Sequence, residues 1–167
     1  MPYYSAHAVI RIGEGLLFNK EHEDFGYLLP GGRFEGGDIK DLEASGLKKE
    51  KKISERVLAR ELKEELNASV IDLTKSVAWQ YSSEGARVYL EIYYGWRPDE
   101  IKTKSGKTYH VDRMYFWGAT IGPTMLSELQ ANAKAELRIM KISEIQAEVL
   151  SPAMRKIVEQ ALNQKVI

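Results

Sequence analysis

The sequence predicts an α/β (α+β) fold in which a mixed β-sheet lies between helices. Short segments rich in Val, Ile, Tyr and Trp occur both before and after one strongly amphipathic helical segment. A second amphipathic segment follows the last of these strands, near the end of the chain. This order of strands, helix, strands and helix is typical of a sheet that helices cover. The 167 residues are most simply one domain, 1–167, with a charged insertion at about 39–53.

The first part of the chain contains three strand candidates and a glycine-rich loop. We expect strands at residues 5–12, 14–18 and 26–29. Residues 30–38, PGGRFEGGD, contain a proline and two glycine pairs, which predict irregular structure whose backbone can approach another group closely. Residues 39–52 are polar and contain Gly46, so we expect a surface excursion with about one helical turn.

A helix is expected over residues 55–66, with Ser54 as its N-terminal cap. Leu58, Leu62 and Leu66 recur every four residues and would form its buried stripe. Asn67 follows the last leucine, and asparagine tolerates the left-handed conformation that often ends a helix.

The second part of the chain is predicted to be mainly strands. They are expected at 69–73, 76–82, 86–96, 113–121 and 136–142, with a turn at 105–107. Ser143 is expected to open a short helix, and Ser151-Pro152 to begin the final one.

Composition excludes several kinds of protein. Lys and Arg number 24 and Asp and Glu number 24, so the chain has no net positive charge with which to attract DNA, and no DNA partner is expected. The absence of cysteine excludes disulfides, thiolate metal sites and cysteine nucleophiles. The sequence begins without a signal-peptide pattern and has no apolar run of roughly 18 residues, so we expect a cytoplasmic protein that does not enter a membrane.

Three carboxylates on the central helix carry the chemical hypothesis. Glu61, Glu64 and Glu65 are spaced i, i+3, i+4 and therefore share one face, where their mutual repulsion costs free energy. A hard divalent cation reverses that repulsion, and Mg²⁺ prefers oxygen ligands. A carboxylate cluster near a glycine loop favours metal-assisted attack on phosphorus. Taken separately, the helix could equally present a solvated acidic face, and the loop could be a simple tight turn.

Together, the loop and the helix resemble the Nudix hydrolase family, whose box reads G-x5-E-x7-R-E-U-x-E-E-x-G-U with U a bulky aliphatic residue. Residues 60–65, RELKEE, match the R-E-U-x-E-E core without a gap, and residues 29–35 resemble the opening loop. With Gly32 as the box glycine, the first box glutamate falls on Asp38. Between Asp38 and Arg60 there are 21 residues where the family has 7, so 14 are inserted. Whether Asp38 returns to the helix is left open, and Asn67 and Ala68 replace the closing glycine and aliphatic residue.

The resemblance implies an α/β/α sandwich, an Mg²⁺ (or Mn²⁺) cofactor and a role for each box residue. Glu64 and Glu65 would bind metal, Glu61 would bind metal or activate water, and Arg60 would orient the carboxylates. The Gly32 carbonyl would add a ligand. A further carboxylate is expected from outside the box, with Glu136 preferred over Glu84 and Glu128. Substrate contacts are expected on the loop, at Gly31, Arg33 and Glu35.

The resemblance further implies a nucleotide-type substrate. The preferred class is a nucleoside diphosphate linked to another moiety, such as ADP-ribose or a nucleotide sugar, and the alternatives are nucleoside triphosphates, RNA 5′ ends and a non-catalytic nucleotide-binding module. An isomerase of the isopentenyl-diphosphate type, which shares the fold, is disfavoured, because its chemistry resembles a cysteine-dependent one and this chain has no cysteine. A possible homodimer stays open. Four lysines in the insertion could form a solvated flap or a basic lid: Lys48, Lys49, Lys51 and Lys52. A nucleotide base could stack on one or two of the aromatic residues of the second part of the chain: Trp79, Tyr81, Tyr89, Tyr93, Tyr94, Trp96, Tyr109, Tyr115 and Trp117. No role is assigned to His7, His22 or His110.

Overall fold

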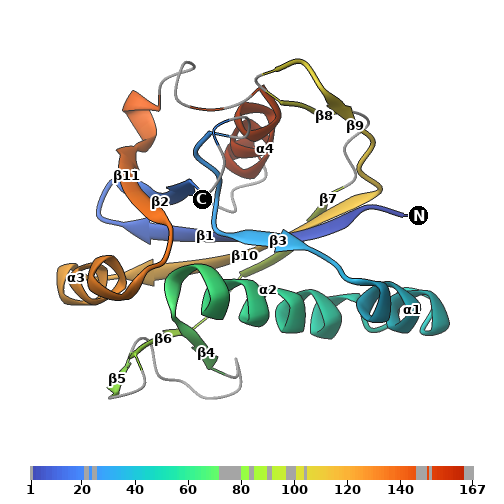
Figure 1. Cartoon of the computed structure of the whole chain (residues 1–167), viewed down its shortest axis with the longest axis horizontal. Coiled ribbons are helices and arrows are strands. Elements are labelled where there is room, and N and C mark those ends of the chain that lie inside the picture. The colour runs from blue at the N-terminus through green and yellow to red at the C-terminus, as the bar shows by residue number, and fades with distance from the viewer. Residues whose placement is uncertain are drawn as a thin grey trace.

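A six-stranded mixed sheet forms the centre of the computed structural model (Figure 1). The structure describes residues 2–20, 23, 26–71, 80–82, 85–89, 92–96, 101–103, 105–145, 150 and 152–163. The strand order is β11-β2-β1-β10-β7, with β3 paired to β1, and the strands are β1 (Tyr4–Ile12), β2 (Gly15–Lys20), β3 (Gly31–Arg33), β7 (Ile92–Trp96), β10 (Arg113–Ile121) and β11 (Glu136–Lys141). Strands β1 and β10 run parallel and the other pairs run antiparallel, so the predicted mixed sheet is confirmed.

Helices cover both faces of this sheet, which confirms the predicted sandwich (Figure 1). One face carries α1 (Gly36–Ala44), α2 (Glu50–Leu66) and α3 (Pro123–Asn132), and the other carries α4 (Pro152–Asn163). A 3-10 turn, η1 (Ile142–Glu144), follows β11. A three-stranded sheet contains β4 (Ser69–Ile71), β5 (Gln80–Ser82) and β6 (Gly85–Tyr89). A two-stranded sheet contains β8 (Ile101–Lys102) and β9 (Thr108–Tyr109). No helix in these parts of the chain is both long enough and apolar enough to span a membrane.

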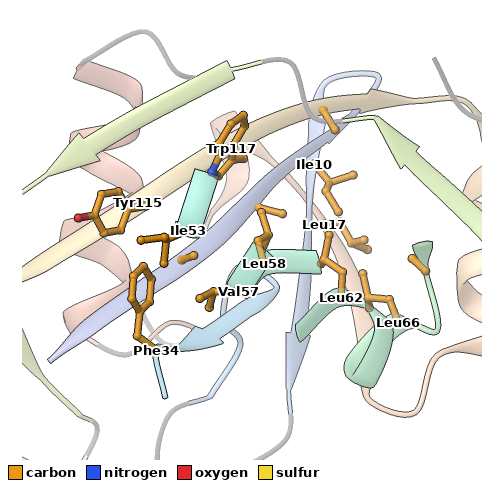
Figure 2. Close-up of a cluster of buried hydrophobic side chains, with 14 of the residues drawn as sticks. Ile10, Leu17, Phe34, Ile53, Val57, Leu58, Leu62, Leu66, Tyr115 and Trp117 are labelled. Atoms are coloured by element: carbon orange, nitrogen blue, oxygen red, sulfur yellow. The ribbon is translucent and has the colours of Figure 1, made fainter. Parts of the chain in front are cut away.

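The alternation of side chains along the strands divides the core into two clusters. The α2-side cluster takes Ala6, Ala8 and Ile10 of β1 together with the predicted leucine stripe of α2 (Figure 2). The α4-side cluster takes Val9 of β1 and residues of α4. Leu58, Leu62 and Leu66 are fully buried, and each contributes roughly 1.5–3 kcal/mol of apolar burial.

Helix α2 begins at Glu50, so the prediction that Ser54 caps it is wrong. Ser54 instead lies inside the helix, where its Oγ donates to the Lys51 carbonyl and accepts from the Trp117 Nε1–H at 3.2 Å. The charged residues before Ser54 are good helix formers, so the helix extends through them. Its C-terminal end is as predicted, because Asn67 is left-handed with φ 51°.

The predicted loop at 30–38 and the excursion at 39–52 are also wrong in part. Residues Gly31–Arg33 form β3, and Gly36–Ala44 form α1. Helix α1 begins with a capping box, in which the Asp38 carboxylate accepts the Glu35 N–H at 3.0 Å. An acidic residue three positions after Glu35 therefore starts a helix where the glycine pair predicted irregular backbone.

In the second part of the chain, the expected strands at 113–121 and 136–142 appear as β10 and β11. Helix α3 was not predicted, although Pro123 at its start and the buried pair Met125 and Leu129 are helix signals. The strand expected at 76–82 is described only as β5, and residues 72–79 lie outside the described residues, as do His22 and Glu84.

His7 is a polar residue in the core of β1. Its side chain is 7% exposed, stacks on Phe116 and donates an Nδ1–H hydrogen bond to the Leu29 carbonyl at 3.1 Å. Burial lowers the pKa of His7 from 6.5 to about 4, because the interior disfavours the imidazolium, and the hydrogen bond to Leu29 opposes this only in part. His7 is therefore neutral in the folded protein at neutral pH.

We expect the free energy of unfolding to fall as the pH drops from 6.5 towards 4, because unfolded His7 takes up a proton in this window and folded His7 does not. Stability from this group is complete above the unfolded pKa, and the full loss at low pH is on the order of 3 kcal/mol. Urea unfolding of the wild type and of His7→Gln at about pH 7 and about pH 5 measures the loss of unfolding free energy in each protein. The difference between the two losses reports His7, because carboxylate effects common to both proteins cancel. Parallel losses in the two proteins would contradict the assignment.

Candidate active site

Two of the three predicted glutamates of α2 lie against the glycine pair of β3. Glu65 is 6% exposed, and its Oε2 accepts the Gly31 N–H at 3.0 Å. A Cβ built on Gly32 would lie 2.2 Å from Oε2 of Glu61. The Glu61 carboxylate therefore packs directly on the backbone at Gly32, in space that any side chain there would fill.

Glu64 differs from its two neighbours because it is exposed to solvent. Its spacing from Glu61 and Glu65 still places the three on adjoining positions of one helix. Within the described ranges, no group of three or more His, Asp or Glu side chains already converges on a point that could hold a cation. The structure thus brings Glu61 and Glu65 to the Gly31-Gly32 backbone of β3 and leaves the Glu64 side chain at the surface beside them.

Arg60 of α2 contacts both β3 and α1 through its guanidinium group. Its Nη1 donates to Oδ2 of Asp38 at 3.1 Å, and its Nη2 donates to the Arg33 carbonyl at 3.3 Å. Carboxylate oxygens of Glu35 and Glu61 each lie 3.7 Å from the same guanidinium. Arg60 is therefore placed to hold the loop backbone against the helix that carries the glutamates.

Asp38 does return to the helix, despite the insertion. Its carboxylate is 6% exposed and pairs with both Arg60 and Arg56. Burial alone would raise the pKa of Asp38, but hydrogen bonds from the Glu35 N–H, Arg56 and Arg60 outweigh it and hold the pKa below its usual value. Sequence reasoning missed Arg56 and Asp41, although Arg56 stands four residues before Arg60 and Asp41 three after Asp38, spacings that put each pair on one helical face.

Glu136, the preferred extra carboxylate, does not join the glutamates of α2. Its Oε1 accepts the Tyr27 hydroxyl hydrogen at 2.5 Å. In the β2–β11 register Glu136 stands opposite Lys20, two positions from Phe18, which belongs to the α4-side cluster. Side chains two apart on a strand share a face, so Glu136 lies on the face of the sheet opposite α2. Of the two weaker candidates, Glu128 lies on α3 and Glu84 lies outside the described residues.

Two of the three predicted substrate contacts, Arg33 and Glu35, are accessible, whereas Gly31 is buried in β3 with its N–H bonded to Glu65. Arg33 is exposed, with its guanidinium 4.6 Å from the Tyr3 ring centre, and the Glu35 side chain is 71% exposed. The four lysines at 48, 49, 51 and 52 are exposed as well, and Lys51 lies over the Trp117 ring.

Two of the candidate stacking aromatics are core residues. Tyr115 and Trp117 are fully buried in the α2-side cluster, so neither ring offers a face to a base. Trp79 lies outside the described residues, and the side chains of the other candidates are not among those described: Tyr81, Tyr89, Tyr93, Tyr94, Trp96 and Tyr109.

Comparisons with known proteins bear on this geometry. No family model matches the sequence, and the search of curated proteins finds no match. Among solved structures, a Nudix hydrolase from Nitrosomonas europaea has a TM-score of 0.50 at 17% identity, covering 99% of this chain and 91% of its own. The Ap4A hydrolase of C. elegans has a TM-score of 0.51 at 11% identity and is covered completely, as is this chain.

A third similar structure is the bifunctional NMN adenylyltransferase/ADP-ribose pyrophosphatase of Francisella tularensis, in complex with AMP and a Mn ion. Its TM-score is 0.51 at 13% identity, with 98% of this chain matched to 42% of that one. Together these likenesses show that the chain has the Nudix hydrolase fold.

Proposed function

We propose that this chain, which has the Nudix hydrolase fold, is a metal-dependent pyrophosphohydrolase. Its substrate would be a nucleoside diphosphate linked to another moiety, of the ADP-ribose or nucleotide-sugar type. The observation that carries the proposal is the packing of Glu61 and Glu65 on the Gly31-Gly32 backbone. The carboxylates of Glu61 and Glu65 lie beside backbone that becomes partly exposed at Gly32, and this supports the approach of a diphosphate and its cation there.

The donor set fits a hard divalent cation. Glu61, Glu64, Glu65 and the Gly32 carbonyl supply only oxygen donors, which suit Mg²⁺ or Mn²⁺. Glycine at position 32 supports the fit, because a side chain there would displace the Glu61 carboxylate. A bound cation would neutralise charge that develops on the diphosphate during hydrolysis. Glu136 is left out of the proposed set, because its carboxylate is bonded to Tyr27 on the other face of the sheet.

The protein's own groups have separate roles in this proposal. Glu61 would accept the proton of the attacking water or ligate the cation, since its carboxylate is the one that faces Gly32. The Gly31 N–H fixes Glu65, and Arg60 fixes the loop carbonyl of Arg33. Arg33 and Glu35, both exposed beside the glycine pair, are the proposed contacts to the substrate.

A panel of substrates tests the proposal. The full chain is incubated with ADP-ribose, a nucleotide sugar, Ap4A, a nucleoside triphosphate and an RNA with a 5′-triphosphate, each with Mg²⁺, Mn²⁺ or excess EDTA. We expect ADP-ribose or the nucleotide sugar to yield two monophosphates with metal, and no product with EDTA.

The products distinguish the competing functions. Pyrophosphate released from the triphosphate or the RNA, in place of cleavage of the linked diphosphates, would contradict the substrate class. Tight nucleotide binding by calorimetry without cleavage of any panel member, with either metal, would contradict the enzyme and identify a binding module.

A further inference from the structure

Asp38 and Asp41 of α1 and Arg56 of α2 form a charged cluster that contacts Arg60, called here the brace. Asp38 and Asp41 stand three residues apart on α1, and Arg56 and Arg60 stand four apart on α2, so the two pairs face each other across the helices. Arg56 Nη2 donates to Oδ1 of Asp38 at 2.8 Å and to Oδ2 of Asp41 at 2.9 Å. Asp38 then contacts Arg60 through its second oxygen, Oδ2. A continuous chain of charged groups therefore runs from Asp41 to Arg60.

The two oxygens of the Asp38 carboxylate have different partners in this series of contacts. One carboxylate oxygen is held by Arg56, and the other accepts both the Glu35 N–H and Arg60 Nη1. With Arg56 in place, the carboxylate cannot rotate without breaking a charge-assisted bond in a site that is 6% exposed. Without Arg56, Oδ1 would lose its protein partner, and the orientation of Oδ2 towards Arg60 would relax.

Stability alone does not account for the outer part of the brace. The Arg56 and Asp41 side chains are 51% and 56% exposed, and exposed ion pairs contribute about 0–1 kcal/mol to folding. The larger consequence is geometric, because Arg60 holds the Arg33 carbonyl and lies beside Glu61. A change in the orientation of its guanidinium would alter the contact that holds the Arg33 carbonyl of β3 against α2.

We propose that Arg56, supported by Asp41, is a positioning residue for the phosphate-cleaving site and acts through Asp38 and Arg60. The inference rests on the proposed function and deepens it. The 21 residues between Asp38 and Arg60 include α1 after Asp38, the turn at 45–49 and the first turns of α2. Despite this separation, Asp38 pairs with Arg60, and Arg56 is a second arginine that holds the same carboxylate.

The test compares Arg56→Gln, Arg56→Lys and Asp41→Asn with the wild type, and with Arg11→Gln as a control that removes an exposed arginine elsewhere. Mn²⁺ affinity is measured by calorimetry, and kcat and KM are measured on the best substrate of the panel. For Arg56→Gln we expect a loss of about tenfold in Mn²⁺ affinity or in kcat, with KM within about twofold. Arg56→Lys should recover part of the loss, because it keeps the charge but not the planar fork. Asp41→Asn should show a smaller loss.

If Arg56 contributed to stability alone, Arg56→Gln would lower the active fraction and the thermal midpoint together and would leave the Mn²⁺ affinity unchanged. Unchanged Mn²⁺ affinity and kcat in Arg56→Gln would overturn the brace while the proposed function stood. If the wild type cleaves nothing but binds Mn²⁺, the proposed function fails, and a weaker Mn²⁺ affinity in Arg56→Gln still supports the brace. If the wild type does not bind Mn²⁺, both fail.

Discussion

Replacing Glu64 with glutamine is expected to lower kcat at least about a hundredfold while leaving the thermal midpoint unchanged. Glu64 is exposed, so the folded state has little to lose when its charge is removed. In the proposed site its carboxylate is a cation ligand, and a neutral amide is a much weaker donor to Mg²⁺. Steady-state rates on the preferred substrate over a range of Mg²⁺ concentrations, together with a thermal unfolding curve, measure both effects.

Lys63→Gln provides the matched control, because Lys63 is the preceding residue of α2 and is also exposed. It should retain activity within about twofold, since surface substitutions away from a site change little. Activity of Glu64→Gln close to that of the wild type at saturating Mg²⁺ would remove Glu64 from the site. Loss of activity with nucleotide binding retained would support the enzyme over the binding module.

Much of the fold follows from periodic patterns that are local in the sequence. The leucines at 58, 62 and 66 and the left-handed Asn67 predict the C-terminal half of α2 correctly, because a helix face repeats within a few residues. The strands at 113–121 and 136–141 are likewise evident from their composition. The box motif adds the proximity of the glycine loop and the helix, which no local pattern contains.

The predictions from sequence are wrong where one local signal outweighs another, and where the pairing register of a strand determines which face a side chain occupies. The glycine pairs near Asp38 predict a loop, but the capping box formed with Glu35 starts α1 there. Glu136 was proposed as a ligand from its place just before a strand, yet the face it occupies depends on its pairing with Lys20. A shift of one residue in that register would turn Glu136 towards α2, and the sequence alone does not specify the register of β11.

The contacts of Asp38 depend on how α1 and α2 pack together. Arg56, 18 residues along the chain, meets Asp38 only because the two helices lie side by side (Figure 1). Helical spacing could have shown that Asp38 and Asp41 share a face, and likewise Arg56 and Arg60. That these faces meet is a property of the tertiary structure, so the sequence left the role of Asp38 open.

Gly31→Ala is expected to destabilise the protein by about 3 kcal/mol or more. Gly31 has φ +146°, which side chains rarely adopt, and an added Cβ would lie 2.1 Å from the Ala6 carbonyl oxygen of β1. That neighbour is backbone, so relief requires β3 to separate from β1, which would also break the bond from the Gly31 N–H to Glu65. Urea unfolding gives the free-energy change, and Gly36→Ala, where an added Cβ meets nothing within 4 Å, is the control.

The adjacent glycine should respond differently, and the contrast tests the whole arrangement. At Gly32 the three atoms nearest to an added Cβ all belong to the Glu61 carboxylate, at 2.2–2.8 Å, and a flexible side chain can move away. Gly32→Ala should therefore fold with a smaller loss of stability than Gly31→Ala, but lose activity because Glu61 leaves the loop. Equal losses of stability in the two variants, or full activity in Gly32→Ala, would contradict the packing of Glu61 on this backbone as the basis of the site.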